Sequence, residues 1–98
     1  MAKLTESEIA QLLEKLAGWE RTGEALEGHF SFAGFADAVT FVVRIGFEAE
    51  AADHHPDVRI NYKRVTLTYS THSEAGLTAK DFAGARAASA IAAAISSR

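Results

Sequence analysis

The feature that most constrains the fold of this chain is an alternation of apolar and polar residues in two runs between residues 57 and 72. The apolar positions are Val58, Ile60 and Tyr62 in DVRINY, and Val65, Leu67 and Tyr69 in RVTLTYSTH. A period of two residues is typical of strands that bury one face and leave the other in solvent. The two runs therefore predict an antiparallel hairpin, with Tyr62 in the core and His72 at the end of the polar row.

A second hairpin is predicted between residues 19 and 32. WERTG and ALEGHFSF surround a glycine turn, and Leu26, Phe30 and Phe32 alternate with polar residues. His29 falls on the polar face of this hairpin, and we interpret it as a solvated residue. We interpret Trp19 as an anchor for the preceding helix.

Three helices are predicted around these hairpins. Thr5 and Glu8 have the spacing of a capping box, and helical periodicity follows as far as Gly18. The segment 34–53 forms the second helix and the alanine-rich segment 79–96 the third, with Thr78 and Asp81 at capping spacing.

The predicted order is therefore helix, strand, strand, helix, strand, strand, helix. Hairpin connections make sequential strands antiparallel neighbours. We expect an α+β fold in which helices cover one face of a four-stranded, mainly antiparallel sheet, and a single domain over residues 1–98.

The helix predicted over residues 34–53 has a very wide apolar arc. A narrow polar stripe separates its edges and consists of Asp37, Thr40, Arg44 and Glu48. One sheet face is too small a partner for such an arc, so the pattern favours a homodimer or homotetramer.

Composition excludes several classes of function. The chain has no cysteine, which rules out a disulfide framework and a thiol nucleophile. Its formal net charge is -3 with scattered basic residues, so we expect no direct nucleic acid binding. The segment MAKLTESEIA does not resemble a secretory signal, and no apolar run approaches the roughly 20 residues that span a bilayer. We expect a cytoplasmic protein without membrane association.

Titratable residues gather in EAEAADHHPD, residues 48–57. Glu50 and His54 are four residues apart, so a continuing helix would bring their side chains together. Glu50 and Asp53 lie where the helix dipole disfavours negative charge, and a nearby imidazolium would compensate. Histidine also suits general acid catalysis near neutral pH, although a single histidine at this place is more often a helix cap. Pro56 restricts the backbone of His55 and fixes how the pair is presented.

The spacing of these residues resembles the signature of the pterin-4a-carbinolamine dehydratase family. The positions that carry the resemblance are Glu50, His54, His55, Pro56, Tyr62, His72 and Asp81. The segments DHHPD, STH and GLTAKD agree as well, and so does the early Gly18-Trp19 pair. The resemblance extends over essentially the whole chain.

The resemblance implies a dehydratase that removes water from a 4a-hydroxytetrahydropterin and yields the quinonoid dihydropterin, without metal or bound cofactor. It assigns catalysis to His54, His55, His72 and Glu50, and binding of the pterin edge to Asp53, Ser70 and Thr71. By chemical role, His54 and His72 would donate protons, His55 would orient the pterin, and Glu50 would hold His54. Asp81 is a candidate for substrate binding that also suits a helix cap.

Two alternatives remain open from the residues. Three histidines and two carboxylates could form a metal site, although adjacent His54 and His55 would converge on one ion with difficulty and HExxH is absent. A protein-binding module is the second alternative, because the apolar arc of residues 34–53 could serve association with little or no catalysis.

Overall fold

The computed structural model describes residues 2–96, and its elements follow the predicted order. They are α1 (Glu6–Glu14), β1 (Trp19–Thr22), β2 (Ala25–Ser31), α2 (Phe35–Ala52), β3 (Asp57–Asn61), β4 (Arg64–Tyr69), the short 3-10 helix η1 (His72–Glu74) and α3 (Ala79–Ser96). The single domain over 1–98 stays a prediction, and Met1, Ser97 and Arg98 lie outside the described residues.

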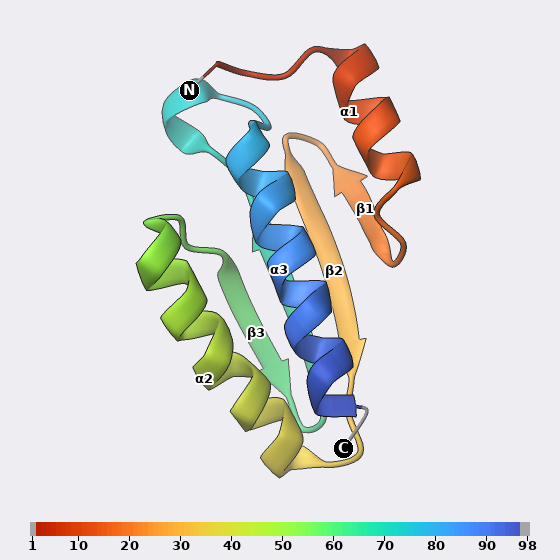
Figure 1. The fold of residues 1–98 in the computed structure, drawn as a ribbon, viewed down its shortest axis with the longest axis vertical. Helices are drawn as coiled ribbons and strands as arrows, with labels where there is room; N and C mark the ends of the chain where they lie inside the picture. The colour runs from red at the N-terminus through yellow and green to blue at the C-terminus, as the bar shows by residue number, and fades with distance from the viewer. Residues whose placement is uncertain (1, 97–98) are drawn as a thin grey trace.

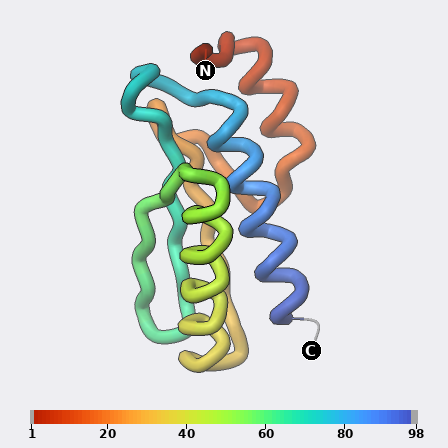
Figure 2. Tube along the Cα trace, turned by 60° about the vertical axis from the view of Figure 1, so that its left-hand side comes forward, coloured from red at the N-terminus to blue at the C-terminus, as the bar shows by residue number. Residues whose placement is uncertain are grey.

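The four strands form one antiparallel sheet in the order β1-β2-β4-β3. The two predicted hairpins therefore meet along β2 and β4. Figure 1 shows α3 in front of the sheet, α2 alongside β3 and α1 beside β1. The turned view in Figure 2 places the β3–β4 hairpin on one side and α3 on the other. The predicted α+β class, with helices on one face, is confirmed.

The core lies between the helices and the inner face of the sheet. In β4 the alternation has the predicted effect, because Val65, Leu67 and Tyr69 are buried while the residues between them are not. Phe41 of α2 and Phe82 of α3 complete the same cluster. The even-numbered residues of β4 therefore face the open side of the sheet.

The β3 strand departs from the prediction. It forms the edge of the sheet and all its residues are exposed, including Val58 and Ile60. Tyr62 follows it in the turn between Asn61 and Arg64, with a φ of 55° and 64% of its surface exposed. The prediction of Tyr62 as a core residue is wrong, because the residue belongs to the turn and not to the strand.

The α1 helix begins as predicted and ends early. Thr5 and Glu8 form the reciprocal capping box. The helix ends at Glu14 instead of reaching Gly18, and the chain turns toward β1 with Gly18 at a φ of 86°. Trp19 is then buried, and its indole N–H donates to Ser89 of α3.

The α2 helix presents apolar residues in two directions. Four are buried against the rest of the chain: Ala38, Phe41, Ile45 and Ala49. Four others, spaced four residues apart, are exposed: Phe35, Val39, Val43 and Phe47. We call these last four the outer stripe of α2. Within residues 2–96, no helix combines the length and apolar character needed to cross a membrane.

Candidate active site

A fully buried carboxylate organises the start of α3. Asp81 Oδ2 accepts hydrogen bonds from the backbone N–H of Thr78, at 2.9 Å, and from the hydroxyl of Thr71, at 2.8 Å. The predicted capping role of Asp81 is therefore present. The side chain does more than cap, because its second oxygen points to another segment of the chain.

Asp81 Oδ1 accepts a hydrogen bond of 2.6 Å from His54 Nε2. The contact depends on how α2 ends: Asp53 adopts a left-handed conformation with a φ of 52°, and the His54 N–H bonds to the carbonyl of Ala49. The side chain of His54 is 13% exposed and its ring lies nearly parallel to Tyr69, with centroids 6.0 Å apart. Because an ionised carboxylate only accepts, Nε2 carries a proton and Nδ1 is left for other partners.

His55 has a different environment although it is the next residue. Its Nε2 donates to Glu50 Oε1 at 2.6 Å, and the two side chains are 54% and 78% exposed. The expected pairing of Glu50 with His54 is therefore wrong. The left-handed turn at Asp53 breaks the helical spacing on which that pairing depended.

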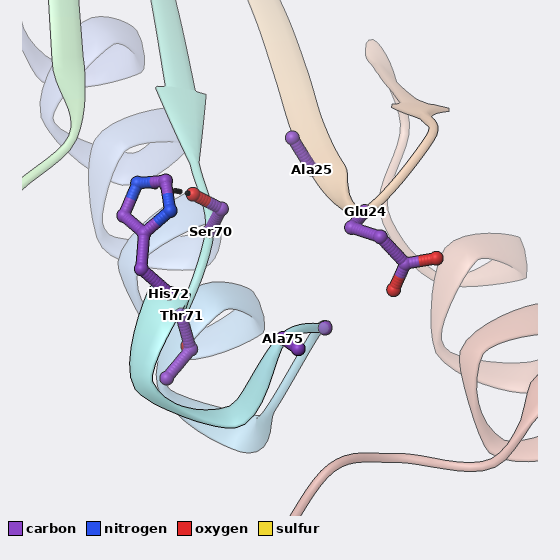
Figure 3. A pocket seen from close by; sticks show the side chains of 7 residues that line it. Glu24, Ala25, Ser70, Thr71, His72 and Ala75 are labelled. Carbon is purple, nitrogen blue, oxygen red and sulfur yellow. Dashed lines mark hydrogen bonds between the residues drawn. The ribbon is translucent and has the colours of Figure 1, made fainter.

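His72 lies in η1 rather than on the predicted strand, because β4 ends at Tyr69. Its Nε2 is 3.3 Å from the hydroxyl oxygen of Ser70. The two side chains border a pocket of about 350 Å³ whose lining is Glu24, Ala25, Ser70, Thr71, His72, Ala75 and Gly76. Figure 3 shows His72, Ser70 and Thr71 on one wall, with Ala25 and Glu24 across from them.

The register of the sheet relates His55 to this pocket. Asp57 pairs with Thr68 and Leu26 pairs with Tyr69. Continuing both pairings past the strand ends sets His55 and Ala25 level with Ser70, on either side of it. His54 points to the helix side, since successive side chains of an extended segment alternate. His54 Nε2 contacts Asp81 of α3, whereas His55 Nε2 contacts Glu50 of α2.

The buried pair and the pocket are linked through Thr71. This residue lines the pocket and donates to Asp81, which in turn accepts from His54. The structure therefore places Ser70, Thr71 and His72 in the pocket lining. His54 and Asp81 are connected to the pocket through the hydroxyl of Thr71. Asp53 is exposed and is not part of the pocket lining.

Four of the lining residues were not identified from the sequence: Glu24, Ala25, Ala75 and Gly76. Glu24 and Ala25 belong to the first hairpin, and only the pairing of β2 with β4 brings them to Ser70. The glycines at 23 and 76 signal turns, and a turn signal alone does not identify a pocket lining.

Tyr69 lies beneath His54 and has a buried hydroxyl with no hydrogen-bond partner among the described residues. Burial raises the pKa of the Tyr69 phenol, and the charge of Glu48 raises it further. The phenol therefore stays protonated at neutral pH and contributes its ring, not a base, to the site.

Within residues 2–96, one group of three side chains has ligand atoms close enough to hold a metal ion. It consists of Glu20, Glu27 and His29 on the open face, all within 4.8 Å of one another. His29 also contacts the Thr66 hydroxyl at 3.2 Å. None of the predicted site residues belongs to this group, and exposed His and Glu side chains often pair in this way without a metal.

The sequence profile of the family described as Pterin 4 alpha carbinolamine dehydratase matches residues 2–91. A relative from Thermomicrobium roseum, which carries the provisional name pterin-4-alpha-carbinolamine dehydratase, is 46% identical over 86 residues, or 88% of this chain and 92% of its own. A relative of the same provisional name from Roseiflexus castenholzii is 47% identical over 81 residues, covering 83% of this chain and 87% of its own.

Solved structures agree with the sequence relatives. A transcriptional coactivator/pterin dehydratase from Brucella melitensis superposes with a TM-score of 0.89 at 41% identity, covering 92% of this chain and 98% of its own. A pterin dehydratase-like RuBisCO assembly factor of the alpha-carboxysome superposes with a TM-score of 0.64 at 20% identity, covering 76% of this chain and 86% of its own. The second likeness shows the fold alone.

Proposed function

Because the chain belongs to the pterin-4-alpha-carbinolamine dehydratase family, we propose that it removes water from a 4a-hydroxytetrahydropterin. The product is the quinonoid dihydropterin, which a reductase could return to the tetrahydro form. The observation that supports this activity best is the buried Asp81, which holds His54 on one oxygen and the pocket residue Thr71 on the other.

The reaction requires two proton movements at neighbouring ring atoms. The 4a-hydroxyl leaves as water when a general acid protonates it, and the C4a–O bond breaks. The electron pair of N5 forms the C4a=N5 bond as the hydroxyl leaves, and loss of the N5 proton to a base, a role that a neutral histidine can fill near pH 7, gives the neutral product. Positioned acids and bases typically contribute about 10²- to 10⁴-fold each.

We assign proton donation to the leaving hydroxyl to His72 and His54. His72 borders the pocket beside Ser70. His54 would act through Nδ1, since its Nε2–H is directed at Asp81. Asp81 is thus a positioning residue that fixes the tautomer of His54 and disperses its charge when it is protonated.

His55 and Glu50 have a separate role in this proposal. Their pair is exposed, and His55 is level with Ser70 when the register of β3 and β4 is continued. We assign orientation of the pterin to His55, with Glu50 supporting it. The backbone of Ser70 and Thr71 would pair with the flat edge of the ring, and Asp53 would contribute to binding of the same edge.

The test is the rate of quinonoid dihydropterin formation from freshly prepared carbinolamine. His54→Ala and His72→Ala should each lower the rate by about 10- to 10³-fold, and the double variant should approach the spontaneous rate. His55→Ala should weaken binding more than it lowers kcat.

His29→Ala is the matched control, because His29 lies on the open face and contacts Glu27 and Thr66, away from the pocket lining. Circular dichroism verifies the fold of each variant. Wild-type protein that fails to exceed the uncatalysed rate, or a folded double variant with full activity, would overturn the proposal.

The same proposal includes independence from metal and from any bound cofactor. Activity should survive prolonged exposure to a strong chelator. Loss of activity on chelation, with recovery on addition of zinc, would favour the metal alternative instead.

We also propose that the protein is a homodimer or homotetramer through the outer stripe of α2. Four apolar side chains at spacing four form one continuous row, and Phe47 is 75% exposed. Rows of this kind on a helix are typical of helix–helix contacts between subunits. Self-association accounts for the row without a foreign partner, so it is preferred to the protein-binding alternative.

Val43→Glu together with Phe47→Glu should convert the assembly to a monomer in sedimentation velocity at micromolar concentration. Thr40→Glu, on the polar side of the same helix, is the control. A wild-type protein that sediments as a monomer would refute the assembly. We further expect a cytoplasmic location and no direct binding of nucleic acid, consistent with the net charge of -3.

A further inference from the structure

The open face of the sheet carries a second pocket, of about 260 Å³, at the end where β4 begins. Arg64 of β4 pairs with Ser31 of β2 on one side and with Asn61 of β3 on the other, so these three residues are level across the sheet. Arg59 pairs with Thr66 and lies one row away on the same face. We call the hollow lined by these side chains the arginine pocket. It shares no lining residue with the candidate active-site pocket.

The two arginines of this pocket have no acidic partner. Within residues 2–96, Arg59 and Arg64 form no ion pair and no side-chain hydrogen bond with another residue. The carboxylates nearest to them in the sheet register are Glu27 and Asp57, which are level with Thr68. Acidic and basic side chains are thus separated along the open face, and both guanidinium groups are available to a ligand.

The remaining polar groups of the arginine pocket are mainly donors. Its lining contains no carboxylate. His29 borders it, but the two ring nitrogens of His29 already contact Thr66 and Glu27. The hydroxyl of Ser31 and the amide of Asn61 can donate, and a guanidinium group can only donate. A ligand that matches this lining is therefore an anion with several acceptor oxygens.

Arg59 and Arg64 are diagonal neighbours in the sheet, a placement that brings long side chains to about 7–8 Å of one another. Their like charges repel, and an anion between them removes the repulsion. A carboxylate fits one guanidinium fork, whereas a phosphate monoester has three terminal oxygens and can bridge two. The net charge of -3 disfavours a polyanion such as nucleic acid. We propose that the arginine pocket binds the phosphate monoester of a small metabolite.

The experiment is a titration of the nitrogen-15-labelled protein with phenyl phosphate, followed by NMR at constant ionic strength. The backbone amide signals of Arg59, Asn61 and Arg64 should shift and saturate, with a dissociation constant of about 1 mM, as expected of a few charge-assisted hydrogen bonds. Sodium chloride at the same ionic strength should not reproduce these shifts, because general screening does not depend on a fork geometry.

Arg59→Gln and Arg64→Gln should each weaken the binding of phenyl phosphate by about tenfold, and the double variant should show no saturable shift. Arg64→Lys retains the charge and loses the fork, so it should weaken binding by less than Arg64→Gln. Arg86→Gln is the matched control, because Arg86 is exposed on α3, outside the pocket lining, and the charge change is the same. It should bind as the wild type does.

Three results would overturn the assignment. The first is a wild-type titration without saturable shifts in β3 and β4, and the second is binding that the double variant retains. The third is a single-stranded hexanucleotide that binds the same residues at least as tightly as phenyl phosphate, which would identify a phosphodiester site instead. The amide spectrum of each variant verifies its fold. The inference does not rest on the proposed function, and its readout is independent of dehydratase activity.

Discussion

His54 and His55 are adjacent in sequence, and each donates to a carboxylate over the same 2.6 Å, yet they belong to different kinds of site. The His54–Asp81 pair is almost enclosed, with side chains 13% and 0% exposed. The His55–Glu50 pair is mostly in solvent. The two pairs therefore contribute differently to the stability of the protein although their hydrogen bonds are equally long, because water screens the His55–Glu50 pair and is excluded from the His54–Asp81 pair.

The difference shows that two adjacent residues can supply one side chain with a fixed position and one that can adjust. His54 is fixed by Asp81, by stacking on Tyr69 and by the hydrogen bond from its backbone N–H to the carbonyl of Ala49. His55 has one exposed partner and can follow a ligand. A proton donor benefits from fixed geometry, whereas a residue that orients substrate benefits from freedom to adjust.

The largest effect should come from Asp81→Ala. The change leaves His54, Thr71 and the Thr78 N–H without their acceptor, and we expect a loss of about 3–5 kcal/mol in the free energy of unfolding. Urea denaturation measures it. Glu50→Ala is the matched variant at the exposed pair and should lower the free energy of unfolding by less than about 1 kcal/mol. Equal losses for the two variants would contradict the comparison.

The next effect concerns the glycine beneath the buried pair. A Cβ at Gly84 would lie 2.5 Å from the Tyr69 ring, on which His54 stacks. Gly84→Ala should therefore displace Tyr69 and destabilise the protein by about 1–3 kcal/mol, with a fall in dehydratase activity through His54.

Gly46→Ala provides the contrast on α2. Nothing lies within 4 Å of a Cβ at Gly46, so the helix propensity of alanine should stabilise the chain by about 0.5–1 kcal/mol. Thermal unfolding of both variants gives the sign of each effect. A stabilising Gly84→Ala change would show that the packing under His54 is loose.

A smaller effect should separate the two histidine pairs by kinetics. Glu50→Gln should raise KM about two- to tenfold with little change in kcat, because it touches only the group assigned to orientation. Asp81→Asn should lower kcat instead, provided that circular dichroism shows a folded protein. A fall in kcat for Glu50→Gln that matches Asp81→Asn would remove the division of roles.

The smallest effect lies at the surface, where Arg21 contacts Glu6. The hydrogen bond and charge of Arg21 lower the pKa of Glu6 from 4.5. Because the pKa of Glu6 is lower in the folded state than in the unfolded state, ionised Glu6 stabilises the protein at pH values above the unfolded-state pKa. This contribution is lost as the pH falls through the folded-state pKa. Glu6→Gln should therefore lower Tm slightly at pH 7 and converge with wild type in acid. A Tm difference that grows below pH 4 would refute the sign.

The sequence predicted the elements of this fold because hydrophobic periodicity is a local property. The alternation in β4, the capping box of α1 and the span of α2 were all confirmed. Tyr62 was wrongly placed in the core because alternation cannot show where a strand ends and its turn begins. Glu50 was wrongly paired with His54 because helical spacing ceased one residue earlier, at Asp53.

By itself, the sequence determined the order of elements, the family and the histidines that carry the proposed chemistry, because each of these depends on the spacing of residues along the chain. Only the tertiary structure decided which carboxylate holds which histidine, and that Glu24 lines the same pocket as His72. These relationships join residues 27 and roughly 50 positions apart. They depend on the pairing of β2 with β4 and on the docking of α3, and no local periodicity encodes such distances.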